Sequence, residues 1–369
     1  MYDPYKALYI HIPFCKQRCT YCDFSTRAVA QDSVLIDEYI EKLILDIRRA
    51  SKEEKLGSLE TVYLGGGTPS YIGQARLSSL LYALSTSMHL TPEIECSMEA
   101  NPDSVTDTLI KDIWALGVNR LSIGVQSFDD ELLALLGRAH SAEQARSAVK
   151  IAQSRFENIS VDLMCGIPGQ SFESFQASLE EAIALGVKHI SVYPLAVEEH
   201  TVLERMIESG ELEEPDQDSQ ALMMQMAASI LEPAGLVRYE VASYAAQGFE
   251  CRHNIAYWTG KPYLGFGTSA VTMTQNDARR MRVQDGQVIE DLDRRQKIAE
   301  DLMMSMRMTE GVSEADVHEA TMLLPDAPLT FRELVQRGFV ERSEGRYRPT
   351  LAGWLCGNEL YGAIFNLAP

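Results

Sequence analysis

Two periodicities alternate along the first half of the chain. Short runs rich in Val and Ile, typical of buried strands, recur about every 30 residues, the length of a βαβ unit. The predicted strands are residues 7–12, 61–64, 94–98, 120–125, 159–163 and 189–193. Amphipathic helical segments lie between them, at residues 34–49, 74–85, 106–116, 142–154 and 172–185. This alternation predicts parallel strands joined by helical crossovers. Six such strands favour an incomplete (β/α)6 barrel, although a doubly wound sheet fits almost as well.

Polar and glycine residues follow the carboxyl ends of these strands. In parallel α/β folds, functional groups gather at that edge of the sheet. The residues found there are Tyr9, the stretch Gly65-Gly66-Gly67-Thr68-Pro69, Glu99, Gln126 and Asp162. Taken alone, the glycines could form a simple tight turn and Glu99 an exposed acid or helix cap. Their convergence predicts a single site at one rim of the barrel.

The pattern changes after Pro194. Helix-like runs at 202–209 and 219–231 precede a β-like run at 237–241 and a glycine-rich, irregular segment at 260–271. From about Arg294, a helix, a hairpin and a closing helix suggest a small winged-helix-like α+β domain. We therefore divide the chain into a barrel at 1–200, an extension at 201–290 and a C-terminal domain at 291–369.

Three cysteines stand close together after the first strand, as Cys15-x3-Cys19-x2-Cys22. Three thiolates at this spacing can hold three irons of a [4Fe–4S] cluster and leave the fourth iron open for chemistry. The alternative is a structural zinc site, which would need a fourth ligand held equally firmly. His11 is the nearest candidate, but its place on an alternating strand indicates a packed or solvated side chain.

Composition narrows the function classes. The 369 residues carry 53 acidic and 33 basic side chains, for a net charge of −20, which repels a phosphate backbone and argues against nucleic-acid binding. We expect the basic cluster Arg279-Arg280-Met281-Arg282 to form a solvated turn or strand face. The first residues lack a signal pattern and no apolar run approaches membrane-spanning length, so we expect a cytoplasmic protein. The other four cysteines read as buried small hydrophobes, at positions Cys96, Cys165, Cys251 and Cys356.

The segments Tyr9-Ile10-His11-Ile12-Pro13-Phe14-Cys15 and Cys19-Thr20-Tyr21-Cys22 resemble the opening of radical S-adenosylmethionine (SAM) enzymes. Within that superfamily the chain is similar to the oxygen-independent coproporphyrinogen III oxidase group. The resemblance implies that the open iron chelates SAM and that an electron from the cluster breaks its sulfonium bond. It implies a place near SAM for the matching residues, which are Tyr9, Tyr21, Gly66, Gly67, Thr68, Glu99, Gln126, Arg138 and Asp162.

Two departures from the oxidase pattern bear on function. Phe24 stands where the oxidase has a further cysteine, and Cys15 lies near the start of the chain. Both features, and the motif His253-Asn254-Ile255-Ala256-Tyr257-Trp258, instead resemble the heme chaperone branch of this group. His253 could then be an axial ligand of heme iron, with Tyr257 and Trp258 against the macrocycle. The alternative is a purely structural role for His253, as a histidine hydrogen-bonded in a loop beside a buried aromatic pair.

Two functional hypotheses follow. The first is a heme chaperone that carries a [4Fe–4S] cluster and SAM, binds heme and delivers it to heme proteins. The resemblance implies respiratory recipients at a membrane surface and a homodimer when the cluster is loaded. The second is an enzyme that oxidatively decarboxylates coproporphyrinogen III with SAM.

Overall fold

The computed structural model describes residues 2–88 and 91–369. Within them, a mixed twelve-stranded sheet has at its centre six parallel strands that pair in chain order, as the periodicity predicts. These are β1 (Ala7–Ile12), β4 (Thr61–Gly66), β5 (Glu95–Ala100), β6 (Arg120–Gln126), β7 (Ile159–Cys165) and β8 (His189–Pro194). The expected incomplete barrel with helical crossovers is confirmed.

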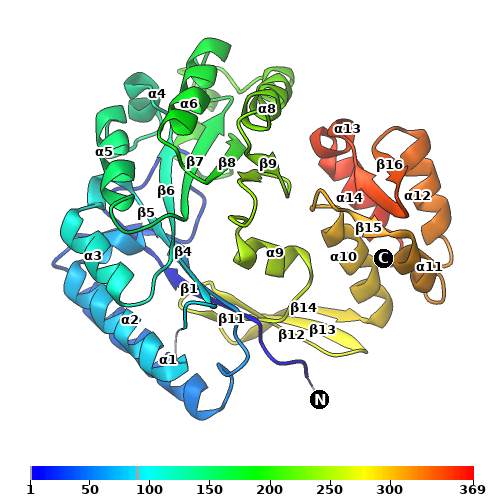
Figure 1. Cartoon of the computed structure of the whole chain (residues 1–369), viewed down its shortest axis with the longest axis horizontal. Helices are drawn as coiled ribbons and strands as arrows, with labels where there is room; N and C mark the ends of the chain where they lie inside the picture. Colours follow the sequence, from blue (N-terminus) through cyan, green and yellow to red (C-terminus); the bar gives the residue numbers. More distant parts are fainter. Residues whose placement is uncertain (1, 89–90) are drawn as a thin grey trace.

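The crossover helices cover the outside of the curved sheet (Figure 1). They are α1 (Val34–Lys52), α2 (Gln74–Met88), α3 (Asp107–Ala115), α4 (Asp130–Leu135), α5 (Ala142–Ala152) and α6 (Phe172–Ala184). Each predicted helix lies within a few residues of its expected bounds, whereas α4 was not predicted. Ser or Thr side chains cap several of these helices and fix where they begin, namely Ser33, Thr106, Ser141 and Ser171. In α1 the residues Ile36, Ile40, Leu43 and Ile47 make one buried stripe against the sheet.

The sheet continues beyond the barrel strands at both edges. On one side β11 (Tyr263–Phe266) pairs parallel with β1, followed by β12 (Val271–Gln275), β13 (Arg279–Gln284) and β14 (Gln287–Asp293). On the other, β10 (Ser243–Ala245) pairs with β8 and with β9 (Val237–Arg238). The prediction of irregular structure at 260–271 was therefore wrong for β11 and for the start of β12, although residues 267–270 between them are irregular. A Cβ on Gly265 would lie 2.3 Å from the Val271 carbonyl oxygen, so the absence of a side chain there allows close backbone approach rather than disorder.

The remaining elements complete the barrel end and the C-terminal domain. Short strands β2 (Phe14–Cys15) and β3 (Arg27–Ala28) pair within the cysteine loop. Helices α7 (Val202–Glu208), α8 (Gln217–Leu231) and α9 (Arg252–Trp258) follow β8. The winged-helix-like domain holds α10 (Arg294–Ser305), α11 (Glu314–Ala320), α12 (Ala327–Gln336), α13 (Leu351–Leu355) and α14 (Gly357–Phe365) around a sheet of order β15 (Val312–Ser313), β17 (Arg346–Pro349), β16 (Val340–Ser343). Among the residues described, no helix combines the length and the apolar character that crossing a membrane requires.

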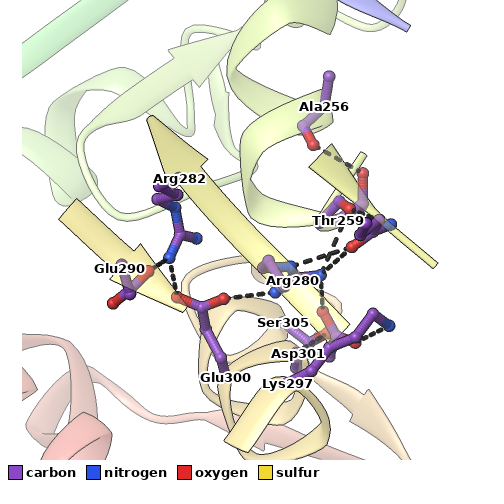
Figure 2. Close-up of polar contacts among 11 residues, drawn as sticks. Ala256, Thr259, Arg280, Arg282, Glu290, Lys297, Glu300, Asp301 and Ser305 are labelled. Atoms are coloured by element: carbon purple, nitrogen blue, oxygen red, sulfur yellow. Dashed lines mark hydrogen bonds and ion pairs between the residues drawn. The ribbon is translucent and has the colours of Figure 1, made fainter. Parts of the chain in front are cut away.

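Buried ion pairs join this domain to the edge of the large sheet (Figure 2). Arg280 on β13 is 1% exposed and lies 2.5 Å from both Glu300 and Asp301 on α10. Arg282 also pairs with Glu300, at 2.8 Å, and with Glu290 on β14. The expectation of a solvated basic cluster was wrong for these two arginines, because acids that follow in the chain neutralise them inside the structure.

We predict that Arg280→Ala lowers the free energy of unfolding by roughly 3 kcal/mol, the low end for breaking a buried ion pair. Glu300 loses its contact with Arg280 but keeps its contact with Arg282. Urea denaturation followed by circular dichroism measures the change. Arg279→Ala is the matched control: Arg279 lies on the same strand and pairs with Asp291, but it is exposed. That variant should change stability little, and equal losses in the two variants would contradict the assignment.

Candidate functional site

The three clustered cysteines lie on the loop that follows β1, at the carboxyl ends of the parallel strands. All three thiols are partly buried and none forms a disulfide. Each has a polar neighbour: Thr68 Oγ1 donates to Cys15 Sγ at 3.6 Å, Arg138 Nη1 lies 3.4 Å from Cys19 Sγ, and Thr26 Oγ1 lies 3.8 Å from Cys22 Sγ. Of the other cysteines, Cys96, Cys165 and Cys251 are buried as expected, whereas Cys356 is exposed and that prediction was wrong.

A hydrogen-bonded chain links the surroundings of Cys15 and Cys19. Asn101 Nδ2 donates to Thr68 Oγ1 at 3.1 Å, and Asn101 Oδ1 accepts from Arg138 Nη2 at 2.8 Å. The same Nη2 donates to the Gly124 carbonyl at 2.5 Å. Sequence reasoning did not single out Asn101. The signal that could have found it is its position directly after β5, two residues beyond Glu99, at the edge where the other polar residues gather.

Glycines allow the loop after β4 to meet the cysteine loop. Gly66 has φ = 112°, and a Cβ there would lie 2.4 Å from the His11 ring. A Cβ on Gly67 would lie 2.8 Å from the Phe14 carbonyl oxygen. The Gly67 amide donates to the Ile12 carbonyl at 2.8 Å, and the Thr68 amide donates to the Phe14 carbonyl at 2.9 Å. The two loops are therefore fixed backbone to backbone.

Glu99 lies on β5, one residue before the strand ends, beside these glycines. Its carboxylate accepts hydrogen bonds from the Gly66 amide and the Tyr63 hydroxyl, both at 3.0 Å. The pKa of Glu99 is raised to about 7, chiefly because the carboxyl is buried. The nearby Asp162 carboxylate acts in the same direction, whereas the hydrogen bonds from Gly66 and Tyr63 act in the opposite direction. The side chain borders a cavity of about 350 Å³, whose lining includes Tyr9, His11, Phe24, Gly66, Tyr257 and Tyr263.

The predicted SAM-site residues fall into three groups. Tyr9, Gly66 and Glu99 share the cavity, while Thr68 and Arg138 contact the cysteines. The remaining four, Gly67, Gln126, Asp162 and Tyr21, lie outside the cavity lining. Gln126 has φ = 69°, next to an irregularity in the β6–β7 pairing. Asp162 accepts hydrogen bonds from Ser122 and Ser160 within the sheet, and Tyr21 packs against an apolar cluster that contains Leu136 and Leu203.

His253 lies in the first turn of α9, not in a loop as expected. It is 1% exposed, and both ring nitrogens are used: Nδ1 lies 2.9 Å from Thr61 Oγ1 and Nε2 lies 3.1 Å from the Tyr257 hydroxyl. Burial lowers the pKa of His253 to about 3, and Arg120 acts in the same direction. The Glu95 carboxylate accepts the amide hydrogens of Arg252 and His253, at 3.0 and 3.1 Å, and so fixes the start of α9. This arrangement is that of a structural histidine in a hydrogen-bonded network, because neither ring nitrogen is free to bind iron.

The cysteine loop fits an iron–sulfur cluster better than a closed zinc site. His11 cannot serve as a fourth ligand as placed, because Nδ1 lies 3.0 Å from the Tyr9 hydroxyl and Nε2 lies 2.9 Å from the Ser25 carbonyl oxygen. In residues 2–88 and 91–369, no three His, Cys, Asp or Glu side chains surround one ion position. Thiolates of a cubane each bind a separate iron and do not need to converge on one point. Burial raises the pKa of Cys15 to about 11, so binding to iron would displace a proton from this thiol.

We predict that the raised pKa of Glu99 makes stability depend on pH. Between the usual value of 4.5 and about 7, the folded chain retains a proton on Glu99 that the unfolded chain releases. Stability therefore falls as pH rises through this window. The thermal midpoint of the native protein should drop relative to that of Glu99→Gln from pH 4.5 to 7.

The matched control is Glu319→Gln on α11, where water surrounds the side chain in the folded and unfolded chain alike. It should show no such trend. A constant difference between native protein and Glu99→Gln across the window would contradict the assignment.

Comparisons with known proteins agree with this architecture. The radical SAM superfamily model matches residues 9–182, and the HemN C-terminal domain model matches residues 292–356. The solved structure of coproporphyrinogen III oxidase (HemN) from Escherichia coli has a TM-score of 0.80 at 21% identity, covering 99% of this chain and 90% of that one. At that identity the likeness establishes the fold alone.

Curated relatives identify the family. The heme chaperone HemW of Bacillus subtilis (strain 168) is 33% identical over 98% of this chain and 99% of its own length. The heme chaperone HemW of Escherichia coli (strain K12) is 37% identical over 72% of this chain and 70% of its own length. With a radical SAM domain, a HemN C-terminal domain and this similarity along almost its whole length, the chain belongs to the HemW family of radical SAM proteins.

Proposed function

We propose that this protein is a heme chaperone that binds heme and passes it to heme-dependent proteins. The observation that carries the proposal is the 33% identity with a curated heme chaperone over nearly the full length of both chains. The cysteine loop and the H-N-x-x-Y-W motif are both intact in this sequence. Recipients at a membrane surface, a homodimer in the cluster-loaded state and a cytoplasmic location remain predictions from the sequence.

The proposed cofactors are a [4Fe–4S] cluster and SAM. Cys15, Cys19 and Cys22 would hold three irons, and Thr68 and Arg138 would donate hydrogen bonds to two of the sulfurs. When bound, the cluster supplies an electron and an open iron position for the amino and carboxylate groups of SAM. The support for this role is the geometry of the loop, where a thiol, a hydroxyl and a guanidinium lie in one hydrogen-bonded chain.

The nucleoside part of SAM would occupy the cavity beside Glu99. The carboxylate can accept hydrogen bonds from a ribose diol, and Gly66 lines the same cavity. Tyr9 contributes an aromatic wall. By resemblance, Tyr21, Gln126, Arg138 and Asp162 would also lie near SAM.

The rival function is oxidative decarboxylation of coproporphyrinogen III. The oxidase fold covers 99% of this chain, but Phe24 replaces the further cysteine of the oxidase pattern. An anaerobic assay separates the two functions. A chaperone should bind stoichiometric heme and transfer it to a heme-free acceptor protein, and should leave coproporphyrinogen III unchanged in the presence of SAM and a reductant. Conversion of coproporphyrinogen III without heme transfer would overturn the proposal.

We predict that Cys19→Ala prevents assembly of the cluster, because the remaining two thiolates cannot hold a cubane firmly. Iron and sulfide analysis after anaerobic reconstitution measures the loss. Cys356→Ala is the control, since this thiol is exposed on the C-terminal domain and should leave iron content unchanged. Full iron and sulfide in Cys19→Ala would refute the ligand assignment.

A further inference from the structure

A second and larger cavity lies between the barrel and the C-terminal domain. Its volume is about 820 Å³, within the range of about 300–1,000 Å³ typical of ligand sites. Its walls come from the end of β8, from α8, β9 and α9, and from α13 and α14 (Figure 1). Three large aromatic side chains line it, namely Tyr193, Trp258 and Trp354.

Two arginines in this wall lack ion-pair partners. Arg238 is 7% exposed and lies 5.0 and 5.5 Å from the ring centroids of Tyr244 and Trp354. Its Nε and Nη2 donate to the Tyr244 hydroxyl, which leaves Nη1 for a ligand. Arg307 lies between Trp258 and Tyr361, at 5.0 and 4.6 Å, and its Nε has no hydrogen-bond partner. Within the described part of the chain, neither guanidinium forms an ion pair with a carboxylate, in contrast to Arg280 and Arg282.

The backbone holds the two arginine positions next to each other. Thr309 donates to the Tyr239 carbonyl from its amide and to the Arg238 carbonyl from its hydroxyl, both at 3.0 Å. Met308 forms an isolated bridge with Glu240. Domain packing therefore brings Arg307 and Arg238, far apart in sequence, to one cavity.

The acids in the wall are Glu214 and Glu240, and neither forms a direct ion pair with these arginines. Glu240 accepts the Ala242 amide hydrogen at 3.4 Å. Burial raises the pKa of its carboxyl, whereas the neighbouring Trp258 and Arg238 side chains act in the opposite direction. Two cations without a direct ion pair, beside aromatic walls, suit a large, flat ligand with carboxylate groups.

We propose that this cavity is where the protein holds heme, with Arg238 and Arg307 binding the two propionates and with Trp258 and Trp354 against the macrocycle. The inference rests on the proposed chaperone function and assigns the site within the molecule. It places heme away from His253, whose ring faces the barrel interior. Of the side-chain types that commonly ligate heme iron, the cavity lining includes Tyr193 and Met224.

Titrations with hemin and with hemin dimethyl ester, whose propionates carry no charge, test the site. Arg307→Gln should weaken hemin binding roughly tenfold or more, since a charge-assisted hydrogen bond is lost, and should leave the ester's affinity nearly unchanged. Arg307→Lys should restore part of the difference. Ala221→Trp adds bulk to the α8 wall without changing charge, and should weaken binding of both ligands.

The matched control is Arg337→Gln. Arg337 also lies over an aromatic ring of the C-terminal domain, that of Phe339 at 4.5 Å, but it does not line the cavity. The Arg337→Gln variant should bind hemin with the affinity of the native protein. Thermal unfolding checks that each variant is folded. If folded Arg307→Gln and Ala221→Trp bind hemin as the native protein does, the cavity assignment is overturned while the chaperone function stands. If the native protein binds no hemin, the proposed function itself fails.

Discussion

The candidate site depends on the close approach of two backbones. The loop after β4 lies against the loop after β1 through the amides of Gly67 and Thr68, at a separation that leaves no room for a side chain on Gly66 or Gly67. That contact places Thr68 beside Cys15, and Asn101 then connects Thr68 to Arg138 and Cys19. A bulkier residue at either glycine would separate the loops and so displace the whole chain of contacts.

The helix α9 explains why one short motif touches two cavities. In a helix, residues four positions apart share a face. His253 and Tyr257 form one such pair: they contact each other, and Tyr257 lines the smaller cavity beside Glu99. Asn254 and Trp258 form the adjacent pair and line the larger cavity. The residues of this motif therefore separate the two cavities, with one face of α9 lining each.

The barrel could be predicted from sequence because its signals are local. Strands such as β1 and helices such as α1 follow from periodicity and capping within a few residues. The errors arose where distant partners decide the outcome. Arg280 is neutralised by Glu300 and Asp301, which lie 20 and 21 residues later in the chain. Gly265 allows its strand to approach the backbone of Val271 closely. Neither contact can be recognised from the residues next to it in the sequence. The polar residues at the strand ends were found for the same topological reason, whereas the burial of His253 depends on Thr61 and Glu95 from the barrel.

Charge also distinguishes the larger cavity from the rest of the molecule. A protein with a net charge of −20 repels a free anion at long range, so an anionic ligand gains a stable position only where local cations are concentrated. Arg238 and Arg307 supply that concentration, since both lie against aromatic rings and neither forms a direct ion pair with any residue that the structure describes. Trp258, which stacks against Arg307, belongs to the same helix as Tyr257, which borders the cavity beside Glu99. Because α9 lines both cavities, any shift of this helix would alter the walls of both together.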